Sequence, residues 1–514
     1  MIDRNVSRIS KVFVAVLVTY LVLAVLQVTT KRPWVDEAWF TAPALDLATH
    51  GRLGTPLLEP TGSHLSIGEP RYVLKGITQR TYWVMPLHLI LQSAWGTLFG
   101  FTVWSMRIPA VLWGLICLFS IRTIVIRLYD SEAAATLAAA VLATEFGFLE
   151  SASDGRMDMM CAALGFAGLA IYLHLRELRL PLAIFLSHSL VAASLFTHPN
   201  GLLAAITLVF CAFWFDRQNL TIRLVLIGTA PYVTGILAWG AYALQAPSDF
   251  AAQMRANAAG RGSEFLHPWH GIYTEIWQRH LFQHFLPAYA GSAALLRVVG
   301  LILFATAIVC ALAMPKLRRR QGCQLLLYLT LLRFLTLSLG ASLKQPYYLV
   351  QVLPFYAAIA GIVGWHLWSF YGRFVRLGVA SLLSLYLAVQ LAVWWHLVAV
   401  TDGYQNKYLP MIAYLRSVVR PGEIVDGSSE LGFAFGFYNP ELIDDLWLGK
   451  WSGKRPTILV MDQWYYYECM HSEKAGAYAP FIEKTIQKEF ALLKKLDGYE
   501  IYRRRPPQPP MLSR

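Results

Sequence analysis

The sequence predicts an all-α polytopic membrane protein with a small soluble α/β domain at its C-terminal end. Three observations lead to this fold class. Of the 514 residues, 56% are hydrophobic and only 15% are charged, whereas soluble domains carry roughly 25% charged residues. About eleven apolar segments approach the roughly 20 residues that a helix needs to cross a bilayer. Beyond residue 400 the apolar runs become short and mixed with polar residues.

The apolar segments define the expected spans, which lie near residues 12–29, 108–127, 133–150, 160–175, 181–197, 201–215, 223–243, 293–313, 324–341, 347–368 and 377–397. The first follows basic residues as a signal peptide would, but no small-residue cleavage site follows it. We therefore interpret it as an uncleaved span. The segment 81–100 is ambiguous, because Pro86, His88, Gln92 and Ser93 make one of its faces polar.

The basic residues of the short loops decide how segment 81–100 lies. If it does not cross, one set of loops shares the side of the N-terminus and carries Arg122, Arg127, Arg176, Arg179, Arg217, Arg223, Lys316, Arg318, Arg319, Arg320, Arg373 and Arg376. The opposite short loops then carry only Arg156 and Lys344. This arrangement obeys the positive-inside rule, and the crossing alternative violates it. We expect 81–100 to be an amphipathic helix on the outer surface.

This topology divides the chain into three parts. Residues 1–399 form the membrane domain, whose long first outer loop covers 30–107. Residues 400–505 form a periplasmic α/β domain, in which "EIVDGS" and "TILVMD" are typical of buried strands and Asp497-Gly498 of a hairpin turn. Residues 506–514 form a disordered tail. The net charge of +13 fits loops that meet anionic lipid headgroups, so we expect membrane lipids as partners and no nucleic acid.

The unusual polar residues of the short loops all fall on the outer side. They are Asp36, Glu37, Arg156, Asp158, His198, Lys344, Tyr347 and Tyr348. Acids and cations that converge beside apolar walls suit a group-transfer site. A carboxylate can act as general base on an acceptor hydroxyl, and cations can hold a phosphate leaving group.

Each of these residues also has a structural interpretation. The acidic pair could be solvated, or could neutralise the neighbouring Lys31 and Arg32. Asp158 could favour the dipole of the helix that it begins, and Arg156 could simply pair with Asp158. Lys344 and the two tyrosines could anchor the interface, and His198 could cap a helix. These alternatives weaken together, because an interfacial belt does not require acids and cations in the same short loops.

Four histidines in the fourth outer loop raise the question of a metal. His267 and His270 are three residues apart, and His280 and His284 are four apart, so the second pair would share a helix face. Such a pair could bind zinc. The aromatic residues around it favour an interfacial segment instead, and we expect no required cofactor.

Four segments in a fixed order carry a resemblance to a known family. They are "VDEAWF", "TYWVMPLHLILQSAWGTLFGFTVWSMRIPAVLWG", "SASDGRMDMMCAALGFAGLAIYLHL" and "KQPYYLVQVLPFYAAIAG". Together they resemble the type-C glycosyltransferase superfamily, above all bacterial aminoarabinose transferases and dolichyl-phosphate-mannose protein mannosyltransferases. The resemblance covers about residues 10 to 400. It implies an enzyme that takes a sugar from a polyprenyl-phosphate carrier on the outer side of a membrane.

The resemblance also implies roles for the acids. Asp36 matches the first-loop acid that acts as catalytic base, with Glu37 in support. Asp158 matches the second-loop acid that helps to hold the acceptor or the site, with Asp154 as a competing acid. Oligosaccharyltransferases of the superfamily use an Asp-x-Asp motif, a divalent metal and a pyrophosphate donor. Adjacent Asp36 and Glu37 lack that spacing, so we expect a monophosphate donor and no catalytic metal.

The cations are expected to bind the donor phosphate. Arg80 stands where aminoarabinose transferases have a phosphate-binding lysine within a Lys-Pro pair, and here the pair is Arg-Thr, which leaves the sugar open. Lys344 and Tyr348 match a cation and a tyrosine near the carrier phosphate, and Arg156 joins them. Tyr347 and His198 are further candidates for substrate contact.

We therefore expect an inverting glycosyltransferase in the bacterial inner membrane, with its active site on the periplasmic face. Its donor is a polyprenyl-phosphate-linked sugar, and its acceptor is a hydroxyl or phosphate on lipid A, a glycan, a protein or a lipid. One alternative is a transporter or flippase of lipid-linked sugars, which would place charges near mid-membrane in repeated halves. The other is a non-catalytic envelope sensor whose C-terminal domain binds a ligand.

Overall fold

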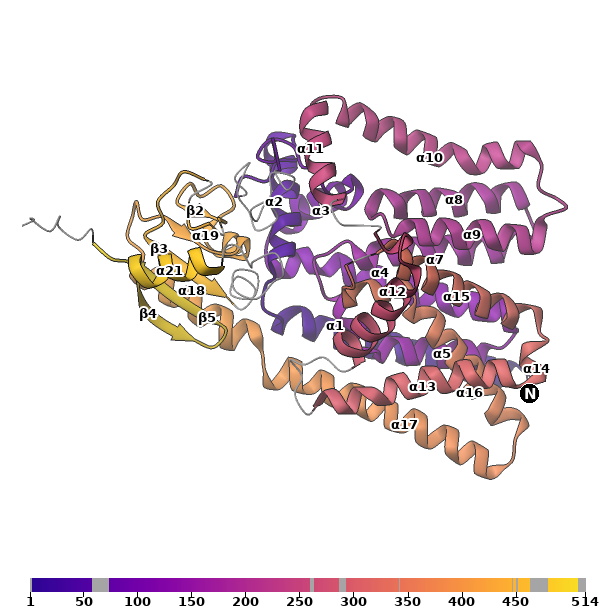
Figure 1. Ribbon diagram of the computed structural model, residues 1–514. Coiled ribbons are helices and arrows are strands. Elements are labelled where there is room, and N and C mark those ends of the chain that lie inside the picture. The colour runs from indigo at the N-terminus through magenta and orange to yellow at the C-terminus, as the bar shows by residue number, and fades with distance from the viewer. Residues whose placement is uncertain are drawn as a thin grey trace, which may run out of the picture.

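A helical bundle with a small sheet at one end makes up the molecule (Figure 1). The computed structural model describes residues 2–57, 74–258, 263–285, 293–341, 343–445, 447–449, 452–462 and 479–506. Three helices lie between the bundle and the sheet: α2 (Val35–His50), α3 (Pro86–Phe99) and α11 (Pro247–Ala258). The predicted fold class is confirmed. Most of the predicted tail lies outside the described residues.

All eleven predicted spans contain helix. Nine described helices are long and apolar enough to cross a membrane. They are α1 (Ile2–Thr30), α4 (Val103–Tyr129), α7 (Asp158–Leu175), α8 (Leu180–Thr197), α10 (Ile222–Ala243), α13 (Ala293–Ala313), α15 (Gln321–Gly340), α16 (Leu353–Phe370) and α17 (Arg373–Trp395). α9 (Gly201–Asp216) has only 16 residues. A bent pair of helices would add a tenth span, and α9 occupies the remaining predicted segment.

The bent pair consists of α5 (Glu132–Thr144) and α6 (Phe146–Ala152), which meet at an angle of 69°. Glu145 causes the break, because its backbone is extended and its carboxylate accepts a hydrogen bond from the Phe148 amide at 2.7 Å. A side chain that caps a new helix ends the preceding one. Sequence hydropathy does not register this, since one glutamate in an apolar run changes the mean little.

Helix α3 is too short to span, because its 14 residues cover about 21 Å at 1.5 Å each. Its polar face turns toward the protein. The Gln92 side chain donates to the Gly155 carbonyl at 2.8 Å, and His88 lies 3.3 Å from the same oxygen. Ile90, Leu91 and Leu98 are exposed on the other side. An outward apolar face is what a helix in a membrane interface requires.

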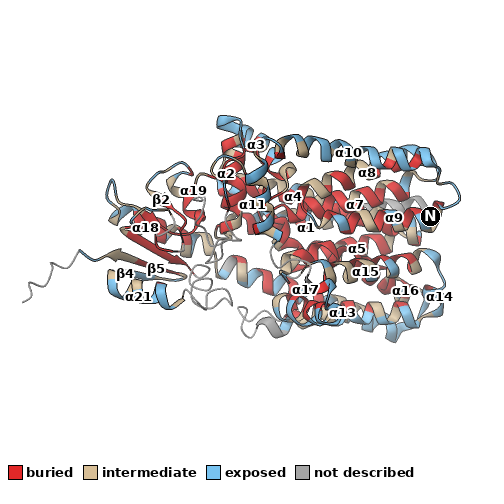
Figure 2. Ribbon diagram, turned by 45° about the horizontal axis from the view of Figure 1, so that its top comes forward, coloured by how far each residue is buried: buried red, intermediate tan, exposed pale blue. Residues whose placement is uncertain are grey.

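The two ends of the bundle differ in charge. In Figure 1 the N-terminus and α14 (Pro315–Arg318) lie at the end opposite to the sheet. Since the spans alternate in direction, the basic short loops share that end. The outermost helices have the most exposed surface, as α10 does in Figure 2, and the interior helices α7 and α16 are largely buried.

The C-terminal sheet has five strands in the order β2-β1-β3-β5-β4. They are β1 (Val425–Asp426), β2 (Leu442–Ile443), β3 (Ile458–Asp462), β4 (Phe490–Leu496) and β5 (Tyr499–Arg504). β1 pairs in parallel with β2 and β3, while β5 is antiparallel to β3 and β4. The predicted hairpin turn is present at Asp497-Gly498, where Gly498 has φ +83°, a conformation that favours glycine.

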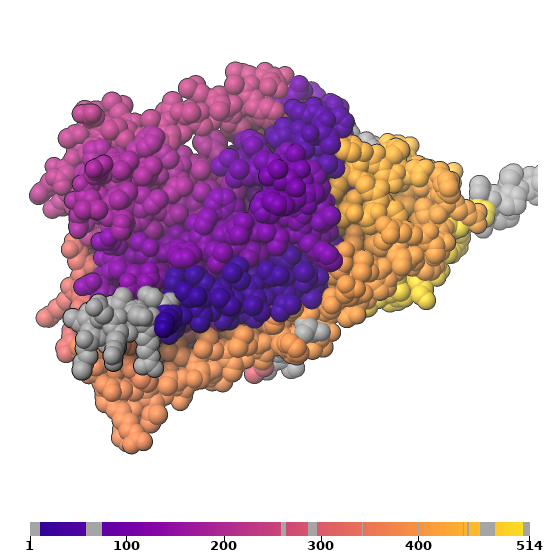
Figure 3. Space-filling model, turned by 180° about the vertical axis from the view of Figure 1, so that it is seen from behind, coloured from indigo at the N-terminus to yellow at the C-terminus, as the bar shows by residue number. Residues whose placement is uncertain are grey.

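The core of this domain is completed by the first outer loop. α18 (Leu409–Val418) packs beside the sheet, and the buried cluster around it includes Ala38 and Ala42 of α2 together with Leu57. Figure 3 shows the C-terminal segment against the N-terminal segments at one end of the molecule. The C-terminal domain and α2 therefore form one packing unit.

A buried ion pair fastens α2 to the bundle. Arg107 of α4 binds both carboxylate oxygens of Glu37 at 2.6 Å and donates to the carbonyls of Val28, Lys31 and Arg32. Burial alone would raise the pKa of Glu37, but the charge and hydrogen bonds of Arg107 outweigh it and lower the pKa to about 2. The bidentate pair satisfies both ions away from water.

We predict that Glu37→Gln destabilises the protein by about 3–5 kcal/mol, because it leaves Arg107 buried without its counter-charge. Arg107→Gln should cost more, since three carbonyls also lose their donor. The double variant should lose less than the sum of the two single losses. Thermal unfolding in detergent measures all three, and strictly additive losses would contradict a coupled pair.

We also predict a pH-dependent stability from Glu430, which accepts a hydrogen bond from the Tyr499 hydroxyl at 2.8 Å. Burial and the nearby Asp462 raise its pKa from 4.5 to about 8, against the opposing charge of Arg32. Its stabilising contribution is therefore complete below pH 4.5 and is lost as the pH rises through the folded-state value. Glu430→Gln should match the wild-type Tm near pH 5 and exceed it by about 2–4 °C near pH 9. Parallel Tm curves across this range would refute the assignment.

Candidate active site

Three predicted residues from two outer loops meet in one charged centre. Arg156, in the loop before α7, forms ion pairs with Asp36 in the first turn of α2 and with Asp158 at the start of α7, the latter at 2.9 Å. Arg156 and Asp158 are almost fully buried, whereas 17% of the Asp36 side chain is exposed. Asp36 is thus the acid of this centre that an incoming molecule reaches first.

Aromatic rings enclose the guanidinium group of Arg156. Its central carbon lies 3.8 Å from the ring centroid of Tyr347, 4.9 Å from that of Trp34 and 5.9 Å from that of Phe40. Burial would lower the pKa of Arg156, but Asp158 and the tyrosines raise it. The arginine therefore stays charged and fixes Asp36 beside a wall of rings.

Glu37 faces a different direction from Asp36. Besides Arg107, it accepts hydrogen bonds from the backbone amides of Gly155 and Trp34, both at 2.9 Å. Gly155 belongs to the same short loop as Arg156, so Glu37 ties this loop to α2. The structure thus separates the two predicted acids, and Glu37 contacts the scaffold of the centre instead of its charged groups.

Lys31, whose place on the outer side is unusual for a basic residue, binds Asp154 at 2.8 Å. Burial and the nearby Glu37 raise the pKa of Asp154 to about 7, and Lys31 opposes this rise. The guanidinium of Arg32 lies 5.5 Å from the ring of Tyr499 in the C-terminal domain. The salt-bridge partner of Lys31 is thus Asp154, and not the adjacent acids Asp36 and Glu37 that the sequence suggested.

Lys344 belongs to a second, buried charge cluster. Its Nζ donates to the Ser338 carbonyl at 2.6 Å and lies 3.6 Å from Glu275. Glu275 also pairs with Arg279 at 2.6 Å, within the π-helix η4 (Glu275–Phe285). The structure therefore does not bring the Lys344 amine to the Asp36–Arg156 centre.

Two adjacent tyrosines connect the two clusters. Tyr347 stacks on Arg156, while the ring of Tyr348 lies 4.8 Å from Tyr347, 5.6 Å from the guanidinium of Arg279 and 5.3 Å from the ring of His198. Nδ1 of His198 also accepts the amide of Asn200 at 3.0 Å, so the predicted capping role coexists with its contact to Tyr348.

The predicted histidine pair does not converge. Nε2 of His284 lies 3.0 Å from Glu145, whereas Nε2 of His280 lies 3.1 Å from the hydroxyl of Tyr356. His267 and His270 are exposed. Within the described part of the chain, no group of three or more His, Cys, Asp or Glu side chains could hold a metal ion.

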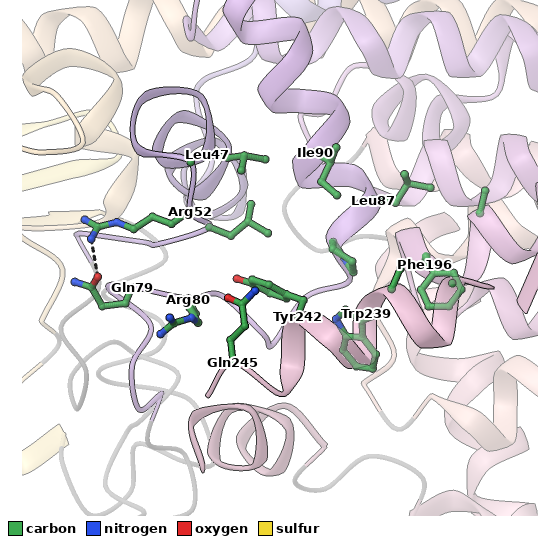
Figure 4. A pocket seen from close by; sticks show the side chains of 16 residues that line it. Leu47, Arg52, Gln79, Arg80, Leu87, Ile90, Phe196, Trp239, Tyr242 and Gln245 are labelled. Carbon is green, nitrogen blue, oxygen red and sulfur yellow. Dashed lines mark hydrogen bonds between the residues drawn. The ribbon is translucent and has the colours of Figure 1, made fainter. Parts of the chain in front are cut away.

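A cavity of about 530 Å³ lies between α2, α3, α8 and α10. Its lining has two parts, as Figure 4 shows. Polar groups gather at one end, where Arg52 donates to Gln79 at 2.6 Å and Arg80 and Gln245 lie nearby. Apolar side chains form the remainder and include Leu47, Leu87, Ile90, Phe196 and Trp239. Such a cavity suits an amphipathic molecule with an anionic head.

An apolar cluster joins the cavity to the charged centre. It comprises Phe40, Leu53, Val84, Leu89 and Met157. Leu53 lines the cavity, and Phe40 lies beside Arg156. Arg80 therefore lines the cavity and does not belong to the charged centre. The apolar cluster lies between Arg80 and Asp36.

Two important arginines are absent from the sequence-based candidates. Arg107 had only a weak signal, because it is the last residue of the predicted first outer loop and the predicted span 108–127 begins just after it. Arg52 had none, since nothing in its neighbourhood distinguishes it from a solvated loop residue. Topology assigns a loop residue to a side of the membrane, but it does not say which residues meet within that side.

Comparisons with known proteins find similar structures but no similar sequences. No protein-family model and no curated protein sequence matches the chain. The crystal structure of ArnT from Cupriavidus metallidurans in the apo state matches with a TM-score of 0.59 and 14% identity, over 97% of this chain and 98% of that one. The same protein bound to undecaprenyl phosphate matches with a TM-score of 0.55 and 16% identity, over 95% and 97%.

An oligosaccharyltransferase from Archaeoglobus fulgidus also matches, with a TM-score of 0.56 and 13% identity, over 97% of this chain and 75% of that one. These proteins belong to the type-C glycosyltransferase superfamily. The match extends through the membrane helices and the C-terminal domain of this chain. The protein therefore has the fold of the type-C glycosyltransferases.

Proposed function

We propose that this protein is a membrane glycosyltransferase that moves a sugar from a polyprenyl-phosphate carrier to an acceptor hydroxyl or phosphate. The proposal rests on one observation. An accessible acid, Asp36, and an amphipathic cavity lie on either side of the same apolar cluster. The fold is that of ArnT, which has been crystallised with undecaprenyl phosphate. The bacterial inner membrane and its periplasmic face are the proposed location.

The cavity would hold the carrier. Its apolar part offers leucine, isoleucine and aromatic side chains from α3, α8 and α10 to an isoprenoid chain, and burial of such a chain is favourable in proportion to its area. Arg52 and Arg80 at the polar end would bind the phosphate through charge-assisted hydrogen bonds. The sugar would then extend toward the charged centre.

Asp36 would act as the general base. Its carboxylate takes the proton of the acceptor hydroxyl while the acceptor oxygen attacks the anomeric carbon. The bond between that carbon and the phosphate oxygen breaks, and the polyprenyl phosphate leaves with the electron pair. Direct displacement inverts the anomeric centre. Asp158 holds Arg156 in place, and Arg156 in turn orients Asp36.

Lys344 and Tyr348 take a supporting part in this proposal. Lys344 balances Glu275 and binds the chain at Ser338, just before the loop that leads to the two tyrosines. Tyr347, Tyr348 and His198 would then line the approach to the Asp36–Arg156 centre for a substrate. No metal takes part in the proposed step.

We predict that Asp36→Asn lowers the transfer rate about 10²–10⁴-fold, because the amide retains the size of the carboxylate but accepts no proton. The measurement is transfer of radiolabel from polyprenyl-phosphate sugars, including aminoarabinose and mannose, in reconstituted membranes. Asp497→Asn is the matched control, since this carboxylate is exposed at a turn of the C-terminal domain. Near-wild-type transfer by Asp36→Asn, at equal expression, would remove Asp36 as the base.

We predict that Arg80→Ala and Arg52→Ala each raise the KM for the carrier-linked donor about 10- to 100-fold, which corresponds to a lost charge-assisted hydrogen bond of about 1.5–3 kcal/mol. The KM for the acceptor should change little. Arg217→Ala, at the opposite end of the bundle, serves as the control for loss of positive charge. If donor KM is unchanged in both variants, the cavity is not the carrier site.

Mass spectrometry of envelope glycolipids and glycoproteins, with and without the gene, would identify the acceptor. A flippase would instead move lipid-linked sugar across vesicles without forming a new glycosidic bond. A sensor would do neither. These outcomes separate the three classes.

A further inference from the structure

Helix α2 is held from several sides at once. Its successive side chains point about 100° apart, and each of the four residues 36–39 has its own partner. Asp36 meets Arg156, and Glu37 meets Arg107. Ala38 enters the core of the C-terminal domain. Trp39 also reaches that domain, through its indole nitrogen.

The contact of Trp39 is specific and buried. Nε1 of Trp39 donates to Oγ of Ser429 at 3.0 Å and to Oδ2 of Asp444 at 3.3 Å. Asp444 in turn accepts the amide and hydroxyl of Ser429. The other side of the indole packs edge-on against Trp83, with ring centroids 5.7 Å apart. A hydrogen bond among buried polar groups is costly to break.

We propose that the C-terminal domain positions Asp36 for transfer through the hydrogen bonds that Asp444 and Ser429 accept from Trp39. The proposal rests on the proposed function, in which Asp36 is the base. Trp39 lies one helical turn from Asp36, so a tilt of α2 at Trp39 moves the carboxylate. Phe40, which follows Trp39, contacts both Arg156 and the wall of the cavity. Asp444, Ser429 and Trp39 are positioning residues and touch no reacting atom.

The same interface supplies a matched control. The hydroxyl of Tyr438 donates to Asp46 at 2.8 Å, near the other end of α2. Asp46 lies ten residues beyond Asp36, about 15 Å along the helix. Asp46 also accepts from Arg52 and from the Gly54 amide, so loss of the tyrosine hydroxyl leaves it satisfied. Tyr438→Phe therefore removes a less buried hydrogen bond between the same two parts at a distant point, together with the contacts of this hydroxyl to Thr49 and His50.

The experiment compares Trp39→Phe with Tyr438→Phe in the full-length protein reconstituted in membranes. We expect Trp39→Phe to lower kcat for sugar transfer about tenfold, with donor KM within twofold of wild type. Tyr438→Phe should leave kcat within twofold. Asp444→Ala should behave like Trp39→Phe, and Asp444→Asn should restore most of kcat, because its amide oxygen still accepts the indole proton.

Hydrogen–deuterium exchange gives a reading that does not depend on activity. The amides of residues 36–42 should exchange at least threefold faster in Trp39→Phe and Asp444→Ala, but not in Tyr438→Phe. Unchanged exchange in both variants would overturn the positioning role, as would equal kcat values for Trp39→Phe and Tyr438→Phe. Failure of the proposed function is read separately, from wild-type protein that transfers no sugar or from active Asp36→Asn. Faster amide exchange in that case still supports the role of the C-terminal domain in holding α2 in place.

Discussion

The ion pair between Glu37 and Arg107 is the constraint on which the geometry of the candidate site depends. Arg107 binds three carbonyls at the end of α1, and Glu37 binds the amide of Gly155 in the loop before α7. Four separate segments thus converge on two side chains that are almost completely buried. Removing one partner would strand a charge where water cannot reach it. The position of Asp36, one residue away, follows from this anchor.

Two adjacent carboxylates thereby acquire different roles. The helical rotation of about 100° per residue turns Glu37 toward α4 and Asp36 toward Arg156. The sequence identifies the acidic pair but does not divide its roles. The division depends on Arg107, which lies 70 residues further along the chain. An arginine at the edge of an apolar span can be solvated or paired, so the sequence does not indicate which acid it meets.

Hydropathy predicts the membrane helices well because their apolar length is a local property. It misses the break at Glu145, where a single capping carboxylate and its partner His284 outweigh the apolar context. Loop topology likewise predicts that Asp36, Arg156 and Asp158 share a side, and the structure brings them together. It does not predict that the amine of Lys344 pairs with Glu275 and not with this centre. The burial of Lys344 depends on its contact with η4. This π-helix has no distinctive sequence pattern.

The sequence places a domain boundary between residues 399 and 400. The residues on the two sides of this boundary nevertheless share one hydrophobic core. The core around α18 is closed by Ala38, Ala42 and Leu57 from the first outer loop. Without the C-terminal domain, this face of α2 would be exposed, and buried apolar area is the main source of its stability. A sensor domain attached to an independent membrane unit would not need such shared packing. The same helix presents Asp36 to the centre and Trp39 to the sheet. The C-terminal domain is therefore a structural part of the unit that presents the candidate site.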